Sequence, residues 1–442
     1  MTDLRSYLNL IKKSGQLKTI RKHVSTKYEV AAITAKLDGS YAALFENIKD
    51  NKFRVVTNLV GTRRRFAQAV GSKEYDIHKK VISAIRHAKK PKTTSRGLFF
   101  ENKTRSLSVL PIIKHFAKEP GPFITSSIIY AKNPETRAQN SSFHRLLPLD
   151  QKHFSVRMVE GRHLHRTFLN AKQHGQDLKV AITVGVHPAI SIAGAYQAEW
   201  GKDEIEIANS LLNNRLTMTK CPITGIFVPS NAEIVMEGKI LRDKTHKEWM
   251  VEMLRTYDFA RMQPVFELES LYYRNNPIFH DILSGYSEHR LLMGMPIEAK
   301  LNGELKRTYP QTRQVCLTNG GCSWLHAVIQ IRKRREDDPK KIIKKTFETH
   351  RSLKMVTIVD EDIDPNNPES VEYAIATRFQ ADRDLVIIKN VRGSSLDPSS
   401  DQKRLRTAKM GIDATKSFMK RKEGFEIAKI QNENRISLKD YF

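Results

Sequence analysis

The middle of the chain places the strongest constraint on its fold. Between about residues 106 and 275 the sequence consists of short β-branched or aromatic runs, such as 178–184, that Pro, Gly and Asn interrupt. Runs of this kind predict the strands of a mainly β domain of barrel type. Helical patterns at 188–198 and 204–212 would be attached to that domain. We therefore expect a central, mainly β domain over residues 106–310.

The segments on either side mix helical and strand patterns. They predict an N-terminal α/β domain over residues 1–105, with helices at 3–14, 28–37, 64–70 and 76–88 and strands at 42–45 and 53–56. They also predict a C-terminal α/β domain over residues 311–442, with helices at 324–335 and 340–350, strands at 355–359 and 384–389, and a loop-rich tail after Gly393. The predicted fold class is α/β (α+β) with three domains.

The chain carries a large excess of positive charge. Its 442 residues include 75 Lys and Arg against 48 Asp and Glu, a formal net charge of +27. Such an excess is compatible with nucleic acid, an anionic membrane surface or small anionic substrates. Acids are interspersed among the basic clusters, and no zinc-finger spacing accompanies them. We therefore do not expect nucleic acid as the main partner, and a basic scaffold that associates with RNA is the competing hypothesis.

Cysteine usage and hydropathy indicate a soluble, cytoplasmic protein. Cys221, Cys316 and Cys322 form no CxxC pair, which fits free thiols in a reducing compartment better than disulfides or a metal cluster with His326. The N-terminus is polar and charged, so we expect no signal peptide. The apolar stretch 180–196 contains His and Pro, which predicts a buried segment and no membrane span.

One set of polar residues offers ligands for a metal ion. The sequence lacks GxGxxG, a Walker-type P-loop, HExxH and GxSxG, so the usual local signatures of cofactor and hydrolase sites are missing. Asn140, His163 and Glu204 offer an amide oxygen, an imidazole and a carboxylate, a mixed set that suits Mn²⁺ or Mg²⁺ with a phosphate completing the shell. The alternative is that Asn140 only forms a turn.

A second set could supply acid–base chemistry. If residues 247–257 are helical, Glu248 and Glu252 lie four residues apart on one face, where repulsion raises one pKa and Arg145 could hold the other group ionised. That is an arrangement for a proton donor. The competing interpretation is a charged helix face with Lys247 and Arg255 as solvated partners.

Motifs along nearly the whole chain resemble the UbiD family of decarboxylases, which use prenylated flavin mononucleotide. They occur in the same order as in that family: DLRSYL at 3–8, LFENI at 44–48, GTRRRFA at 61–67, QNSSFHRL at 139–146, GRH at 161–163, EIEIANSLL at 204–212, TKC at 219–221, VPSNAEIVMEG at 228–238, NPIFH at 276–280, VDEDID at 359–364 and GIDAT at 411–415.

The resemblance implies a cofactor site in the central domain. That domain would be a split β-barrel that binds the flavin, and the metal ligands would be Asn140, His163 and Glu204. The ion, Mn²⁺ or Mg²⁺ with K⁺ as a further candidate, would bridge to the flavin phosphate. The residues implied to line or neighbour the cofactor are Phe143, His144, Arg145, Arg157, Arg162 and His163. Glu237 is a further carboxylate for which we expect a structural role.

The resemblance also implies a catalytic trio of Arg145, Glu248 and Glu252. Arg145 would position the substrate carboxylate, and Glu252 or Glu248 would donate the proton. The family's Glu-Gly-Pro-Phe-Gly-Glu/Asp motif is replaced here by Glu-Trp-Met-Val-Glu-Met at 248–253, which lacks the glycines and proline. A changed loop at this point indicates a changed substrate.

The altered loop is similar to an archaeal branch that decarboxylates trans-anhydromevalonate phosphate to isopentenyl phosphate, a step of a modified mevalonate pathway. A phosphorylated acid suits a cationic pocket, with Arg255 and Arg261 as candidate phosphate partners. An aromatic acid resembling 4-hydroxybenzoate is the alternative substrate. The resemblance further implies a flavin prenyltransferase as cofactor supplier and self-association as a dimer or hexamer.

Overall fold

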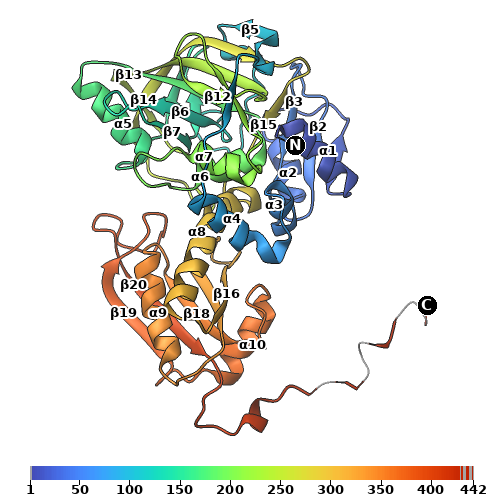
Figure 1. Ribbon diagram of the computed structural model, residues 1–442, viewed down its shortest axis with the longest axis vertical. Coiled ribbons are helices and arrows are strands. Elements are labelled where there is room, and N and C mark those ends of the chain that lie inside the picture. Colours follow the sequence, from blue (N-terminus) through green and yellow to red (C-terminus); the bar gives the residue numbers. More distant parts are fainter. Residues whose placement is uncertain (1, 429, 432–434, 438–440, 442) are drawn as a thin grey trace.

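The computed structural model describes residues 2–428, 430–431, 435–437 and 441 (Figure 1). The N-terminal and central parts of the chain form one lobe, and the C-terminal part forms a second (Figure 1). The helix α8 (Ser287–Thr308) runs from the first lobe into the second. Among the described helices, none combines the length and the apolar character that crossing a bilayer requires.

The N-terminal part is an α/β unit whose sheet is completed by a late segment of the chain. Its elements are α1 (Leu4–Lys13), β1 (Leu17–Ile20), α2 (Glu29–Lys36), β2 (Ala42–Phe45), β3 (Arg54–Thr57), α3 (Arg63–Ala69) and α4 (Ile77–Arg86). The sheet order is β1-β2-β3-β15, in which β15 (Ile278–His280) pairs in parallel with β3. Because β15 follows the central strands, it ties this unit to the central domain.

The central part is a curled antiparallel sheet. Its strands are β5 (Asn102–Thr104), β6 (Ile128–Lys132), β7 (Gln139–Phe143), β8 (Leu146–Pro148), β9 (His153–Val156), β10 (Leu178–Val184), β13 (Ile234–Glu248) and β14 (Arg261–Tyr273). Their order is β7-β6-β10-β13-β14-β9-β8, with β5 also paired to β14. The expected mainly β central fold of barrel type is confirmed (Figure 1).

Helices and a small sheet surround this half-barrel. The helices are α5 (His163–Gln173), α6 (Pro188–Ala195) and α7 (Glu204–Leu211). The small sheet has the order β12 (Phe227–Pro229), β11 (Thr217–Lys220) and β4 (Lys92–Thr94). Short 3-10 helices lie at Glu74–Asp76, Leu98–Glu101, Leu107–Val109 and Lys422–Phe425. Both α6 and α7 pack against β7, which places their ends beside one edge of the half-barrel.

The C-terminal part is a five-stranded sheet covered by helices. The strand order is β16 (Thr312–Leu317), β17 (His326–Ile331), β18 (Met355–Asp360), β20 (Arg406–Ala414) and β19 (Leu385–Arg392), and the helices are α9 (Asp338–Thr349) and α10 (Pro368–Arg378). The expected mixed α/β character is confirmed. Helix α8 packs on both β16 and α9, and it also contacts α4 in the other lobe.

One expectation for the C-terminal part is wrong. The predicted helix at 324–335 is the strand β17, because its apolar run is buried between β16 and β18, and short apolar runs fit either structure. The region after Gly393 is rich in loops but also contributes β20, which lies inside the sheet. Gly411 weakens the strand pattern in the sequence. The glycine is needed there, because a Cβ would lie 2.4 Å from a side-chain carbon of Ile343 on α9.

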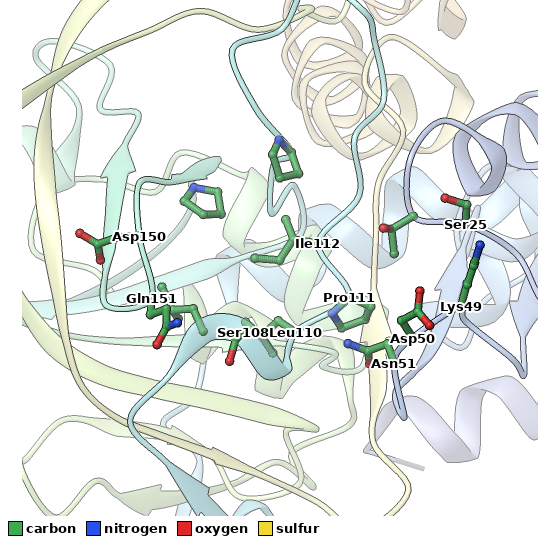
Figure 2. Close-up of a pocket in the computed structure, with 14 residues that line it drawn as sticks. Ser25, Lys49, Asp50, Asn51, Ser108, Leu110, Pro111, Ile112, Asp150 and Gln151 are labelled. Carbon is green, nitrogen blue, oxygen red and sulfur yellow. The ribbon is translucent and has the colours of Figure 1, made fainter.

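A pocket of about 520 Å³ opens between the N-terminal and central parts (Figure 2). Ser25, Lys49 and Asn51 line it on one side, and Pro111 and Gln151 line it on the other (Figure 2). Its lining includes none of the residues that the sequence assigns to a cofactor, a metal or catalysis. The candidate chemistry therefore lies elsewhere, at the edge of the half-barrel.

Candidate active site

The three candidate metal ligands meet beside β7. Asn140 lies on β7, His163 is the first residue of α5, and Glu204 is the first residue of α7. The Asn140 amide nitrogen lies 2.8 Å from Glu204 Oε2 and 3.3 Å from His163 Nδ1, and His163 Nδ1 lies 3.5 Å from Glu204 Oε1. All three side chains are buried. Three elements that are far apart in sequence thus bring the predicted set together.

Capping interactions explain why Glu204 reaches β7. Asp203 is the N-cap of α7, and its carboxylate accepts hydrogen bonds from Ile205 N, Ser141 Oγ and Gln139 Nε2 at 2.7–3.1 Å. Burial raises the pKa of Asp203 to about 7. Because Ser141 N also donates to Glu204 Oε2 at 3.0 Å, the start of α7 is fixed to the strand that carries Asn140.

The donor set fits a divalent ion. A half-turn of the Asn140 amide would exchange its nitrogen for its oxygen, giving one oxygen, one imidazole nitrogen and one carboxylate around a common point. Among the described residues no group of three or more His, Cys, Asp and Glu is arranged to hold a metal, so a site here depends on that amide. Glu237 is not part of this cluster, because its carboxylate accepts hydrogen bonds from Ile223 N and Thr224 N.

The second predicted set surrounds Arg145, which follows β7 in the chain. Its Nε and Nη2 donate to the two carboxylate oxygens of Glu248 at 3.1 and 3.0 Å, and its Nη1 donates to Glu252. Burial alone would lower the pKa of Arg145. The negative charges of Glu252 and Glu248 have the opposite and larger effect, so the pKa of Arg145 is raised. The guanidinium is therefore a fixed positive charge between two carboxylates.

The glutamates reach Arg145 by a hairpin and not by the helix predicted at 247–257. Strand β13 ends at Glu248, and the chain then folds back through a bridge between Val251 and Tyr257. Glu252 N donates to Thr256 O at 2.8 Å within this turn. The buried side chains of Met250, Val251 and Met253 anchor the hairpin. Tertiary burial of these apolar residues overrides the helical spacing of the two acids.

Two residues near Arg145 were not anticipated. Asp258 Oδ2 lies 3.6 Å from Arg145 Nη2 and also pairs with Arg261. No turn signal in the sequence reveals that the hairpin returns Asp258 to Arg145. His289, on the first turn of α8, accepts a hydrogen bond from Gly285 N at 3.1 Å, and burial lowers its pKa. It escaped notice because the sequence did not predict α8.

The remaining candidate residues lie between the two sets. His144 Nδ1 is 2.8 Å from Arg157 O and Nε2 is 2.8 Å from Ser142 Oγ, and burial lowers the His144 pKa to about 4. His144 is therefore neutral near pH 7. Phe143 packs in part against the core, Arg157 Nη2 lies 3.9 Å from Asp258, and Arg162 precedes α5 with an exposed side chain.

Comparisons with known proteins agree with this architecture. Three domain models of 3-octaprenyl-4-hydroxybenzoate carboxy-lyase match the chain: the N-terminal domain at residues 8–85, the Rift-related UbiD domain at 87–287 and the C-terminal domain at 290–414. Two proteins named anhydromevalonate phosphate decarboxylase are similar. The one from Methanocaldococcus jannaschii is 40% identical over 91% of this chain and 95% of its own. The one from Methanothermobacter thermautotrophicus is 36% identical over 93% of this chain and 96% of its own.

Solved structures give the same result. The UbiD-class enzyme HmfF from Pelotomaculum thermopropionicum, in complex with FMN, matches over 100% of both chains with a TM-score of 0.97 and 36% identity. An evolved dimeric form of HmfF in complex with prFMN also matches over 100% of both chains, with a TM-score of 0.93 and 35% identity. The resemblance noted in the sequence is thereby confirmed, and the chain belongs to the UbiD family of carboxy-lyases.

Proposed function

We propose that the protein decarboxylates trans-anhydromevalonate phosphate to isopentenyl phosphate with prenylated flavin mononucleotide as cofactor. The observation that carries the proposal is the largely buried Arg145 between Glu248 and Glu252, in a chain 36–40% identical to relatives named for this activity. The reaction would belong to a modified mevalonate pathway of isoprenoid biosynthesis.

The cofactor would lie against the cluster of Asn140, His163 and Glu204. These side chains supply the donors for Mn²⁺ or Mg²⁺, and the ion would in turn bind the flavin phosphate. Arg162 directly precedes His163 and adds a positive charge on the same side. The prenylated flavin, when bound, would supply an electron sink for the electron pair that departing carbon dioxide leaves behind.

The protein's own acids would supply the proton that replaces carbon dioxide. One proton must reach the substrate carbon in each turnover, and Glu252 is the better placed donor because its side chain is 21% exposed against 1% for Glu248. Glu248 holds both Nε and Nη2 of Arg145 and thereby fixes the guanidinium. Arg145 would orient Glu252 and share its charge with the substrate carboxylate.

Two partners follow from the proposal. A flavin prenyltransferase must supply the modified cofactor. The protein would also self-associate, as a dimer or a hexamer, and the existence of a dimeric form of HmfF supports this part of the proposal.

The test is a turnover assay on protein produced together with a flavin prenyltransferase and supplied with Mn²⁺. Carbon dioxide release is compared for trans-anhydromevalonate phosphate and 4-hydroxybenzoate. We expect release from the phosphorylated acid alone. Release from 4-hydroxybenzoate alone would assign the aromatic substrate in its place, and release from neither acid would overturn the proposal.

A further inference from the structure

Two arginines contact the hairpin that carries Glu252. Arg255 lies at the turn, where its backbone N donates to Glu252 O at 2.9 Å. Its Nε donates to Gly285 O at 3.0 Å, and its guanidinium carbon lies 4.0 Å from the centre of the Tyr286 ring. Arg290, on the first turn of α8, donates from Nε to Met253 O at 3.4 Å. Both guanidinium groups are thus fixed to one short turn.

The close fit of the turn on Gly285 keeps Arg255 in place. Gly285 has a φ of +76°, and a Cβ there would lie 2.6 Å from Arg255 Cγ and 3.0 Å from Glu252 O. Only a glycine satisfies both the backbone conformation and the contact. The positions of Arg255 and Glu252 are therefore set together.

Neither arginine has an acidic partner within the part of the chain that the structure describes. Arg145, Arg157 and Arg261 each lie within 4.0 Å of a carboxylate, whereas no ion pair involves Arg255 or Arg290. Each uses only its Nε in a side-chain hydrogen bond. The terminal nitrogens stay available, because Arg255 is exposed and Arg290 is partly exposed.

The two charges also act on each other. Burial lowers the pKa of Arg290, and the positive charge of Arg255 lowers it further. Two like charges near each other, neither of them in an ion pair among the described residues, favour binding of an anion, and a phosphate matches the planar fork of donors that each guanidinium presents. Arg261, which the sequence suggested for this role, is held by Asp258.

We propose that Arg255 and Arg290 bind the phosphate group of the substrate, a proposal that rests on the proposed decarboxylation of a phosphorylated acid. Phosphate bound there would lie on the turn whose first residue is Glu252. Binding energy from the phosphate end of the substrate would then hold Glu252, the proton donor, close to the carbon that takes up the proton. Arg255 and Arg290 would determine specificity for phosphorylated over unphosphorylated acids.

The first experiment compares Arg255→Gln, Arg290→Gln and the double variant with the wild-type holoenzyme. Arg307→Gln, an exposed arginine on the same helix α8, is the matched control. We expect each single change to lower kcat/KM for the phosphorylated acid by about 10- to 100-fold, the usual effect of losing a charged hydrogen bond, mainly through KM. The flavin spectrum should stay unchanged, and kcat/KM for unphosphorylated anhydromevalonate should fall far less, since for that acid only the arginine contacts with Gly285 O and Met253 O are lost.

A loss of the same size for both acids, or no loss for the phosphorylated one, would overturn the phosphate assignment. A second measurement separates this failure from failure of the proposed function. Inorganic phosphate, titrated into the holoenzyme, should raise the Tm of the wild type and of Arg307→Gln but not that of the double variant. This holds whichever acid the wild type decarboxylates. An equal shift in all proteins, or no shift in the wild type, would show that the two arginines form no phosphate site.

Discussion

The two ends of the candidate site are built in different ways. At the proposed metal end, Asn140, His163 and Glu204 occupy positions that regular structure fixes, one on a strand and two at helix starts. At the acid end, Glu252 and Asp258 lie on a hairpin tied to Arg145. We therefore expect the proposed metal end to keep its structure when one ligand is changed. The structure of the acid end should instead depend on the Arg145 guanidinium.

Removal of Arg145 should have the largest effect. Arg145→Met leaves Glu248 and Glu252 without their charge partner, whereas Asp258 keeps Arg261. Breaking such a network costs about 3–5 kcal/mol of unfolding free energy. We expect a large fall in Tm and no turnover, measured by thermal unfolding and carbon dioxide release. Arg21→Met, an exposed arginine, is the control and should leave Tm unchanged. A wild-type Tm for Arg145→Met would contradict this account of the hairpin.

A change at the metal end should remove the cofactor and spare the fold. Glu204→Gln keeps an oxygen that can accept from Asn140 and Ser141 but removes the charge that a divalent ion needs. We expect loss of bound metal and of flavin absorbance, with Tm close to that of the cofactor-free wild type. Metal analysis and an absorbance spectrum test this, with the exposed Glu199→Gln as control. Full metal content in Glu204→Gln would remove this residue from the site.

Asp258→Asn should have a moderate effect, because Arg145 keeps its two glutamate partners. Asp258 lies 3.6 Å from Arg145 and also holds Arg261, so its charge helps to close the hairpin. We expect kcat to fall roughly tenfold, which corresponds to about 1.4 kcal/mol, with an unchanged flavin spectrum. An effect as large as that of Arg145→Met would show that Asp258, and not Glu252, is the essential acid.

The last expected effect is confined to acidic pH and is a change in the pH dependence of stability at the junction of the two ends. Burial lowers the pKa of His144 to about 4, so the unfolded chain takes up a proton there before the folded protein does. Stability should fall as pH drops from about 6.5 to about 4, by up to about 3 kcal/mol for this group. In His144→Gln this part of the loss should disappear. Urea unfolding of the cofactor-free protein between pH 4 and 7 measures it, and identical slopes would contradict a buried neutral histidine.

Periodic segments could be predicted from the sequence, because their burial follows a simple repeat. The four residues at helical spacing in α1, Leu4, Tyr7, Leu8 and Ile11, are all buried, and the expected strand at 178–184 is β10. Helix α8 was missed because Pro296 and two glycines interrupt its pattern, although Gly294 is needed there: a Cβ would lie 2.5 Å from Ser323 O. With α8 missing, His289 and Arg290 could not be placed.

The candidate site was predictable only in part, for a related reason. Asn140 and Glu204 are 64 residues apart, and no local pattern shows that they meet; the family resemblance supplied that link. Glu248 and Glu252 were correctly grouped with Arg145, but on a helix that does not form. The hairpin depends on contacts with distant segments, such as the hydrogen bond from Val251 N to Glu119 Oε1 at 3.2 Å.

The rate of carbon dioxide release by the Glu252→Gln holoenzyme tests the central claim most directly. The change removes a proton donor at nearly constant shape, and a general acid contributes about 10²- to 10⁴-fold to the rate. We predict a loss of kcat in that range from trans-anhydromevalonate phosphate, with the flavin spectrum and bound metal of the wild type. A kcat within a few-fold of the wild type would contradict the claim that Glu252, held by Arg145, donates the proton.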